Sequence, residues 1–242
     1  MKITVVIPTY NEYENLPLLV EKIFSLEMEG LDLLIVDDNS PDGTGQLAED
    51  LSSQYQHRIK VMHRAGKLGL GTAYNQGFRL AIADGADYIG QMDADFSHPI
   101  DKLPEMANAL NNCDVVIGSR YVSGGALDET WPFYRKWLSG FGNFYARTIL
   151  GLSIKDVTGG YKLWKRTTLE AMPLDRIKAN GYMFQVEMNY VATRLGFKFQ
   201  EIPIYFKERT AGTSKMNLAI SKEAAVRTWK LRKTYQDIKP IK

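Results

Sequence analysis

Short apolar runs alternate with helical patterns through the first half of this 242-residue chain, and that alternation limits the fold more than any other feature. Five runs have the length and near-continuous apolar character of strands buried on both faces: "ITVVIP", "LDLLIVDD", "RIKVMH", "ADYIGQMD" and "CDVVIGS". Helical patterns lie between and after them, over 15–26, after Pro41, over 71–83 and after Pro99. This alternation predicts an α/β fold, a Rossmann-like and mostly parallel sheet with helices on both faces.

The alternation stops after Arg120. The stretch "YVSGGALDETWPFY" contains glycines and has no clear period, which indicates a loop. The elements expected beyond it are a helix over 134–150, a glycine-bearing stretch "DVTGGYKLW", a helix over 183–195, a strand "KFQEIPIYF", a polar loop "KERTAGTSKMN" and a helix over 218–235. Since no repeat, low-complexity stretch or linker interrupts the chain, we expect a single domain over 1–242.

Cysteine content and hydropathy indicate the cellular environment of the chain. The chain has one cysteine, Cys113, so an intramolecular disulfide is excluded and a thiolate zinc site is disfavoured. A reducing, cytoplasmic setting fits this content. The N-terminal apolar run is too short for a signal peptide, and no stretch approaches the roughly 18 uninterrupted apolar residues of a spanning helix. We therefore expect no membrane crossing by this chain.

The charge of the chain is unevenly distributed. The net charge is only +2, yet residues 215–242 carry eight Lys or Arg against two acids. A basic tail behind a mildly acidic body predicts an anionic partner, either nucleic acid or a membrane surface. A solvated helix face explains the count equally well. No nucleic-acid recognition motif accompanies the tail, which disfavours nucleic acid as the partner.

Polar side chains follow three of the expected strands, where the ligands of such sheets bind. They are Tyr10, Asn11, Glu12, Asp37, Asp38, Asp93 and Asp95. In "QMDADFSHP", acids at i and i+2 on an extended segment would point the same way and repel each other unless a cation, ligand or solvent compensates them. A solvated turn with capping acids is the simpler alternative. The gathering of acids on one edge favours a divalent-metal site instead.

Three other motifs suggest nucleotide chemistry less directly. "KLGLGTAYNQG" follows the third strand and lacks the G-x-G-x-x-G order, so a turn and close packing explain its glycines better, and no P-loop sequence is present. "IVDDNSPDG" follows the second strand, whereas the paired acids of a response-regulator receiver follow the first. Asp38 is suited to accept hydrogen bonds from a base or ribose. Tyr10 is suited to stack on a base or cover the core, and His98 to form a local hydrogen bond.

Eight motifs run in order through nearly the whole chain: "PTYNEYENL", "VDDNSPDGT", "KLGLGTAYNQG", "MDADFSHP", "GSRY", "DVTGGYKLW", "GYMFQVEM" and "EIPIYFKERTAGTSKM". Together they resemble the family 2 glycosyltransferases, and within these the dolichol- or polyprenol-phosphate mannose synthases. The resemblance implies a GT-A fold, a GDP-mannose donor, a dolichyl or polyprenyl phosphate acceptor and a Mg²⁺ or Mn²⁺ ion. It also implies a nucleotide-binding subregion over 1–120, an acceptor subregion over 121–215, and a basic C-terminal helix and tail over 216–242.

The resemblance also assigns roles to individual positions. The donor-contacting positions are matched by Pro8, Tyr10, Glu12, Val36, Asp38, Asp93, Ala94, Asp95, Arg120, Arg209 and Lys215. The acceptor-side positions are matched by Arg120, Arg135 and Ser139, and the metal-binding positions by Asp93, Asp95 and Ser97. Some members have Gln at 97, and because a hydroxyl is a shorter and weaker ligand, a water could replace Ser97. The implied catalytic set is Asp93, Asp95, Arg120 and Arg209.

The implied reaction is an inverting, metal-dependent transfer of mannose that gives a β-linked lipid phosphate. A phosphate monoester is largely dianionic at neutral pH, so it needs little or no general base. Because the D-x-D element specifies neither base nor sugar, the same fold could use UDP-glucose or another nucleotide sugar. A non-catalytic nucleotide- or lipid-phosphate-binding module is a rival from another class. The lipid acceptor implies a peripheral protein at the cytoplasmic face of a membrane, with a separate membrane-anchoring protein as a further partner.

Overall fold

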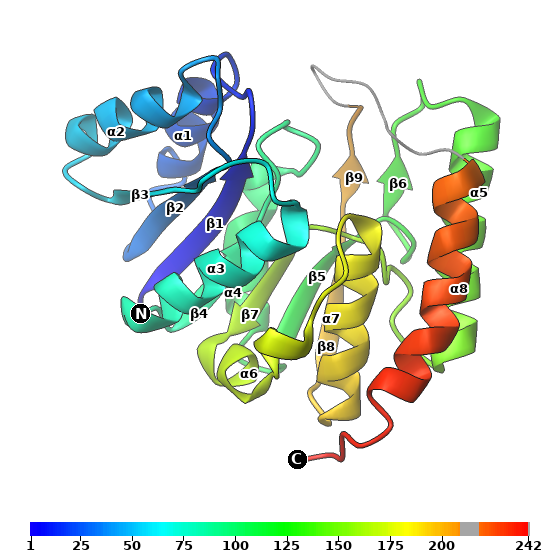
Figure 1. Cartoon of the computed structure of the whole chain (residues 1–242). Coiled ribbons are helices and arrows are strands. Elements are labelled where there is room, and N and C mark those ends of the chain that lie inside the picture. The colour runs from blue at the N-terminus through cyan, green and yellow to red at the C-terminus, as the bar shows by residue number, and fades with distance from the viewer. Residues whose placement is uncertain (209–217, 242) are drawn as a thin grey trace.

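The computed structural model describes residues 1–208 and 218–241, with the side chains of α8 described from Val226 onward (Figure 1). A seven-stranded sheet forms its centre, in the order β3-β2-β1-β4-β7-β5-β8. Its strands are β1 (Ile3–Thr9), β2 (Leu31–Asp37), β3 (Ile59–His63), β4 (Tyr88–Gln91), β5 (Val115–Ser119), β7 (Lys162–Lys165) and β8 (Phe199–Pro203). A second sheet pairs β6 (Ala126–Leu127) with β9 (Tyr205–Phe206).

Helices cover both faces of the sheet, as the alternation predicts. They are α1 (Leu16–Phe24), α2 (Thr44–Gln54), α3 (Leu70–Ala83), α4 (Leu103–Ala109), α5 (Phe133–Leu150), α6 (Arg166–Ala171), α7 (Tyr182–Arg194) and α8 (Leu218–Thr234), with short 3-10 helices η1 (Ile100–Lys102) and η2 (Leu174–Arg176). Side chains of a strand alternate between faces. Val5 of β1 packs with α1, α2 and α4, whereas Val6 packs with α3, α6 and α7.

One expectation about strands is wrong, and one strand was not expected. "DVTGGYKLW", to which the sequence analysis assigned no element, contains the strand β7, which runs antiparallel to both its neighbours β4 and β5. The expected strand "KFQEIPIYF" is two strands, because β8 ends at Pro203 and β9 leaves to pair with β6 inside the expected loop over 121–134. The backbone N–H of Ile204, between them, donates to Ser119 O (3.0 Å). The sheet is therefore mixed, although mostly parallel.

The glycines of "KLGLGTAYNQG" serve close packing, as expected. A Cβ at Gly71 would lie 2.3 Å from Ala179 O, and a Cβ at Gly69, where φ is +102°, would lie 2.7 Å from Asn180 Oδ1. The segment that approaches them is held by Glu187, whose Oε2 accepts hydrogen bonds from the backbone N–H groups of Lys178 (3.1 Å) and Ala179 (2.8 Å). The start of α3 is thereby fixed against α7.

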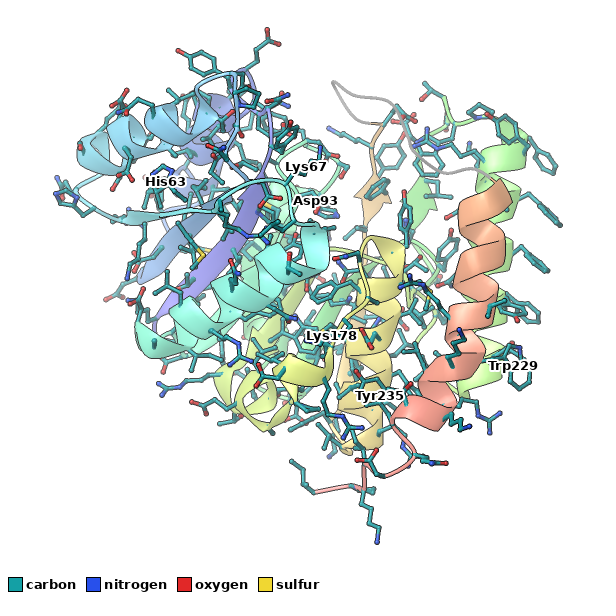
Figure 2. The ribbon with its side chains drawn as sticks, in the orientation of Figure 1. His63, Lys67, Asp93, Lys178, Trp229 and Tyr235 are labelled. Carbon is teal, nitrogen blue, oxygen red and sulfur yellow. The ribbon has the colours of Figure 1, made fainter. Side chains whose placement is uncertain are left out.

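Helix α8 packs against α5 and α7 at one side of the molecule (Figure 1). Tyr235, just beyond α8, donates its hydroxyl to Glu187 Oε1 (2.8 Å) and to Arg176 O (2.9 Å), and Figure 2 shows it near the lower end of α7. Within 1–208 and 218–241, no helix has the combination of length and apolar composition needed to cross a membrane.

Candidate active site

The carboxyl ends of β1, β2, β4 and β5 meet at one edge of the sheet, because these strands are parallel in the mixed sheet. The chain leaves each strand there into a loop that carries predicted site residues. Figure 2 shows Asp93 and Lys67 at this edge. The expected gathering of polar residues therefore occurs, and their contacts decide which of them are available to a ligand.

Asp37 is a structural acid rather than a ligand-binding one. Its carboxylate accepts hydrogen bonds from Thr9 Oγ1 (3.0 Å), Ser40 Oγ (2.6 Å) and the backbone N–H of Ser40 (3.0 Å). These bonds close the loop after β2, in which Asn39 has a left-handed φ of +57°. Asn tolerates this conformation better than most residues. The neighbouring Asp38 is thereby placed at the edge.

Asp38 forms a buried ion pair with Arg64, which follows β3 and which the sequence analysis missed. Arg64 is held from the other side, because its Nε donates to Gln76 Oε1 (3.0 Å) and its Nη2 to Thr72 Oγ1 (2.5 Å), both on α3. Burial raises the pKa of the Asp38 carboxyl, although Arg64 opposes the shift. Asp38 Oδ2 accepts no hydrogen bond from the described residues, so one carboxylate oxygen remains for a ligand.

Tyr10 and Glu12 lie in the loop after β1. The Lys67 ammonium lies 3.6 Å from the centroid of the Tyr10 ring, a cation–π contact that covers one ring face. Glu12 accepts a hydrogen bond from Asn15 Nδ2 (2.8 Å), beside a hollow of about 270 Å³ lined by residues 11–15 and Asp42. A base could therefore stack on this face of Tyr10 only if Lys67 moved, whereas the other ring face is not covered by Lys67.

Pro8 and Val36 are paired strand residues of β1 and β2. Pro8 lacks an N–H, and it is tolerated in β1 because β4 pairs with β1 only as far as Val6. The Val36 side chain is fully buried in the core. A nucleotide could therefore meet Val36 only through its backbone.

Asp93 and Asp95 lie beyond β4, which ends at Gln91, so the expectation of an extended segment is wrong. Asp93 Oδ1 accepts a hydrogen bond from the Tyr74 hydroxyl of α3 (3.1 Å), and the Asp95 carboxylate accepts one from the backbone N–H of Ser97 (3.1 Å). Burial raises the pKa of Tyr74 well above its usual value, which keeps the hydroxyl protonated as a donor. The backbone bends at Asp95, so the alternation of side chains along a strand does not apply to these two acids.

A hydrogen bond, an unusual backbone conformation and a buried side chain also shape this loop. His98 Nδ1 accepts a hydrogen bond from the backbone N–H of Asp93 (3.1 Å), which confirms the expected local role of His98. Phe96 adopts a left-handed φ of +61°, which is uncommon for a bulky residue and is a type of strain that clusters at active and ligand-binding sites. Ala94 is buried between the two acids, with an exposed fraction of 3%.

The loop suits a divalent cation that prefers oxygen ligands. Asp93 and Asp95 supply two carboxylates, and the hydroxyl of Ser97 is buried without a hydrogen-bond partner in the described residues. Mg²⁺ and Mn²⁺ prefer such hard oxygen ligands and are commonly shared with substrate phosphates. No group of three or more His, Cys, Asp or Glu that could hold a metal occurs among residues 1–208 and 218–241. A cation here would need further ligands from water or a bound phosphate.

Arg120 follows β5 and is fixed by Asp156 in a buried ion pair. Its backbone N–H (2.9 Å) and Nε (2.7 Å) donate to Asp156 Oδ2, and its Nη2 donates to Asp156 Oδ1 (2.7 Å) and Thr158 Oγ1 (2.8 Å). Burial would raise the pKa of Asp156, but Arg120 outweighs burial and lowers it. Asp156, which the sequence analysis missed, therefore holds Arg120 as a permanently charged and oriented group.

A buried lysine lies behind the edge. Lys162 of β7 is opposite both Gln91 of β4 and Ile117 of β5, and its ammonium donates to Gln185 Oε1 (2.5 Å). The same oxygen accepts a hydrogen bond from Gln91 Nε2 (2.7 Å). Burial lowers the pKa of Lys162 to about 7, although Asp156 opposes the shift. Lys162 also escaped the sequence analysis.

The predicted acceptor-side residues Arg135 and Ser139 lie on α5. Arg135 Nη1 donates to both carboxylate oxygens of Glu208 (2.9 and 2.8 Å), and its guanidinium lies 3.6 Å from the Trp131 ring centroid. Ser139 shares a hydrogen bond with the Tyr121 hydroxyl (2.7 Å), which connects α5 to the residue after Arg120. Arg209 and Lys215 lie outside the described residues.

The same architecture occurs in solved structures of low sequence identity. A mannosyl-3-phosphoglycerate synthase from Rubrobacter xylanophilus matches with a TM-score of 0.67 and 16% identity, over 98% of this chain and 75% of that one. A mannosyltransferase from Pyrobaculum calidifontis, solved in complex with GDP-Man and Mn²⁺, matches with a TM-score of 0.60 and 18% identity, over 98% and 67%. The fold is therefore the GT-A fold of glycosyltransferases, as predicted.

Sequence similarity gives the family. Residues 4–172 match glycosyl transferase family 2, and the chain belongs to this family of glycosyltransferases. An undecaprenyl-phosphate mannosyltransferase from Micrococcus luteus is 44% identical over 93% of this chain and 92% of its own length. A polyprenol monophosphomannose synthase from Mycolicibacterium smegmatis is 42% identical over 94% and 86%. The resemblance drawn from the eight motifs is confirmed.

Proposed function

We propose that this protein transfers mannose from GDP-mannose to a polyprenyl or dolichyl phosphate, with inversion at the sugar carbon and a β-linked product. The observation that carries the proposal is the similarity of 44% and 42%, over nearly the full length, to two proteins named for mannosyl transfer to a polyprenyl phosphate. The D-x-D loop and the two buried arginine–aspartate pairs at the sheet edge support it. We keep the division into subregions 1–120, 121–215 and 216–242 as part of the proposal.

The donor would bind along the loops after β1, β2 and β4. Asp38, with one oxygen unpaired, suits the N–H donors of a base or the hydroxyls of a ribose. Guanine offers two adjacent N–H donors, and the unpaired Asp38 Oδ2 would accept from one of them. Tyr10 would stack on the base, and Pro8, Glu12, the backbone of Val36, and Ala94 would contact the nucleotide. Arg209 and Lys215 would contact its phosphates.

Asp93 and Asp95 would hold Mg²⁺ or Mn²⁺, with Ser97 or a water as a further ligand. When bound, such an ion supplies positive charge that offsets the negative charge developing on the leaving pyrophosphate. The Tyr74 hydroxyl and the Ser97 N–H position the two carboxylates. Without a cation, two carboxylates on this loop would repel the donor phosphates.

The acceptor phosphate would lie between Arg120 and α5. Arg120 is held charged by Asp156, and the Tyr121–Ser139 hydrogen bond fixes α5 beside it. An acceptor phosphate monoester is already dianionic at neutral pH, so the attacking oxygen needs no proton removed. Arg120, and Arg135 if Glu208 releases it, would orient that oxygen for a single displacement at the sugar carbon.

The lipid tail of the acceptor lies in a membrane, and the exposed face of α5 is suited to bind a membrane surface. Large aromatic side chains of α5 are between 49% and 83% exposed: Phe133, Tyr134, Trp137, Phe141 and Phe144. Aromatic residues of this kind favour the membrane–water interface. Basic residues of α8 would add about 1 kcal/mol each at an anionic surface. We therefore propose peripheral binding at the cytoplasmic face of a membrane, with or without a separate anchoring protein.

The test is transfer of labelled mannose from GDP-mannose into the organic phase with a polyprenyl phosphate, with Mg²⁺ or Mn²⁺ and with EDTA. We expect metal-dependent transfer, loss of it in Asp95→Ala, and near-normal transfer in Asp101→Ala, an exposed acid of η1. Transfer only from UDP-glucose in a parallel reaction would overturn the sugar and donor. An α-linked product by NMR would overturn the inverting mechanism.

A further inference from the structure

We propose that a basic hollow at the C-terminal ends of α5, α7 and α8 binds the phosphate of an anionic phospholipid headgroup. The hollow measures about 520 Å³, and its walls include Leu150, Tyr190, Arg194, Trp229, Arg232 and Lys233. This inference rests on the membrane binding proposed above and deepens it. The lipid it concerns is a lipid of the bilayer and not the acceptor.

The location separates the hollow from the active site. The D-x-D loop and Arg120 lie at the carboxyl ends of the sheet strands, whereas Figure 1 shows α7 and α8 ending at the opposite end of the molecule. Figure 2 shows Trp229 beside the lower part of α5 and α8, distant from Asp93. A phosphate bound in the hollow could therefore not be the attacking group of the transfer reaction.

All the charged residues that line the hollow are basic. Arg194, Arg232 and Lys233 contribute three cations, and no acid is among the residues that line it. The nearby Asp237 is engaged elsewhere, because it accepts two hydrogen bonds from Arg176 (2.7 and 2.9 Å). Cations in the last turn of a helix offset the helix dipole, but that effect needs no hollow. Asp237 also interacts with the charge of Arg194, but it is hydrogen-bonded to Arg176 and does not line the hollow. Three cations around one concavity predict an anionic ligand.

Arg194 is held in position and retains hydrogen-bonding capacity. Its Nη2 donates to the carbonyl oxygens of Ile238 (2.7 Å) and Gln236 (3.3 Å), which fixes the guanidinium under the chain beyond α8. Its Nη1 donates no hydrogen bond within the described residues. A phosphate oxygen in the hollow is a suitable acceptor for this charged donor.

An aromatic path connects the hollow to the exposed face of α5. Trp229 donates its Nε1–H to the Tyr145 hydroxyl (2.9 Å), and the Tyr145 ring lies 6.4 Å from that of Phe141. Phe141 in turn stacks on Trp137 at 5.2 Å. Trp229, Phe141 and Trp137 are each about half exposed. A headgroup phosphate in the hollow would thus have an apolar surface beside it for its acyl chains, which a free phosphate ion could not use.

The test compares two double variants that remove the same charge from the same part of the chain. Arg232→Gln with Lys233→Gln removes two cations of the hollow, and Lys230→Gln with Lys239→Gln removes two exposed cations outside it. Sedimentation with phosphatidylcholine vesicles, with and without phosphatidylglycerol, measures binding. We expect the first variant to lose at least about tenfold more phosphatidylglycerol-dependent binding than the second. Equal losses would mean diffuse attraction between charges and would overturn the proposal.

Two further measurements separate the alternatives. Thermal unfolding with inorganic phosphate, against chloride at equal ionic strength, tests a soluble ligand. One outcome would identify free phosphate, and not a lipid, as the ligand. In it, phosphate stabilises the second variant but not the first, and both variants bind vesicles equally. Mannosyl transfer to a detergent-dispersed acceptor is expected to remain in both variants. Since sedimentation requires no catalysis, failure of the transfer assay would count against the proposed function without affecting the result for the hollow.

Discussion

Two buried arginine–aspartate pairs lie at the same sheet edge, and they are built in opposite ways. In the first, Arg64 is shared among Asp38, Gln76 and Thr72, so Asp38 receives one hydrogen bond from it and keeps an oxygen unpaired. In the second, Asp156 receives three hydrogen bonds from Arg120 and is fully buried. The first pair presents a carboxylate, and the second presents a guanidinium.

The difference is also visible in the pKa values of the two acids. Burial raises the pKa of Asp38 because Arg64 compensates it incompletely, whereas Arg120 overcomes burial and lowers the pKa of Asp156. A carboxylate that is incompletely paired is suited to receive a ligand, and one that is saturated is suited to hold a neighbour. The same pair of residue types therefore serves binding on the donor side and positioning on the acceptor side.

The largest effect is expected from Asp156→Asn. The change leaves Arg120 buried without its carboxylate, which is expected to lower the free energy of unfolding by about 3–5 kcal/mol. Urea denaturation measures it. Asp175→Asn, which breaks an exposed pair with Arg79, is the control, with an expected loss below about 1 kcal/mol. Similar losses in both variants would contradict the positioning role of Asp156.

A smaller effect on stability and a specific effect on binding are expected from Asp38→Asn. The affinity for GDP should fall by about ten- to a hundredfold, because hydrogen bonds to a charged group contribute about 1.5–3 kcal/mol. Titration calorimetry measures it. Asp84→Asn, in an exposed pair with Lys60, serves as the control. Unchanged GDP affinity in Asp38→Asn would contradict the assignment of Asp38 to the nucleotide.

Lys162 lies between the two pairs, and its replacement by Met tests whether burial lowers the pKa of its ammonium group. Between about pH 7 and 10 the unfolded chain binds a proton on Lys162 that the folded protein does not, because burial lowers its pKa to about 7. The free energy of unfolding therefore rises with pH there, by up to about 1.4 kcal/mol per pH unit from this group. Lys162→Met should lose this slope, and Lys165→Met should keep it. Equal slopes would contradict the lowered pKa.

The smallest effect is expected from Tyr74→Phe, which removes one hydrogen bond to Asp93 and little else. A loss of about 1 kcal/mol corresponds to a roughly fivefold weaker apparent affinity for Mn²⁺ in the transfer assay. Tyr88→Phe, on the neighbouring β4, provides a matched control. A hundredfold loss in Tyr74→Phe would mean that the hydroxyl does more than position Asp93.

The sequence predicted the parallel part of the sheet because its strands are apolar runs and its helices have clear periods. β7 escaped because "KLWK" has a lysine at each end and is therefore not an apolar run, and Lys162 is an atypical residue for a fully buried strand position. Strand direction depends on where the chain re-enters the sheet. After α5, residues 151–161 return the chain to the carboxyl edge, where Asp156 meets Arg120, and β7 therefore enters the sheet antiparallel.

The sequence predicted some residues of the candidate site and missed the residues that hold them in place. Positions directly after strands, such as Asp38 and Arg120, could be found from the order of strands and motifs. Their partners Arg64 and Asp156 were missed, because exposed Lys, Arg and Asp are so common that a single one carries little information. An arginine immediately after the third strand was a usable signal for Arg64. Asp156 depends on a contact between residues 36 positions apart, which no local pattern encodes.

The distribution of tryptophans gives the molecule an intrinsic optical probe. Of its four tryptophans, Trp131 and Trp164 are buried, with exposed fractions of 8% and 0%, whereas Trp137 and Trp229 are 59% and 54% exposed on α5 and α8. Transfer of the α5–α8 face into lipid would shift the emission of the exposed pair to shorter wavelength. The buried pair would supply a constant background, so that docking could be followed by fluorescence in the unlabelled protein.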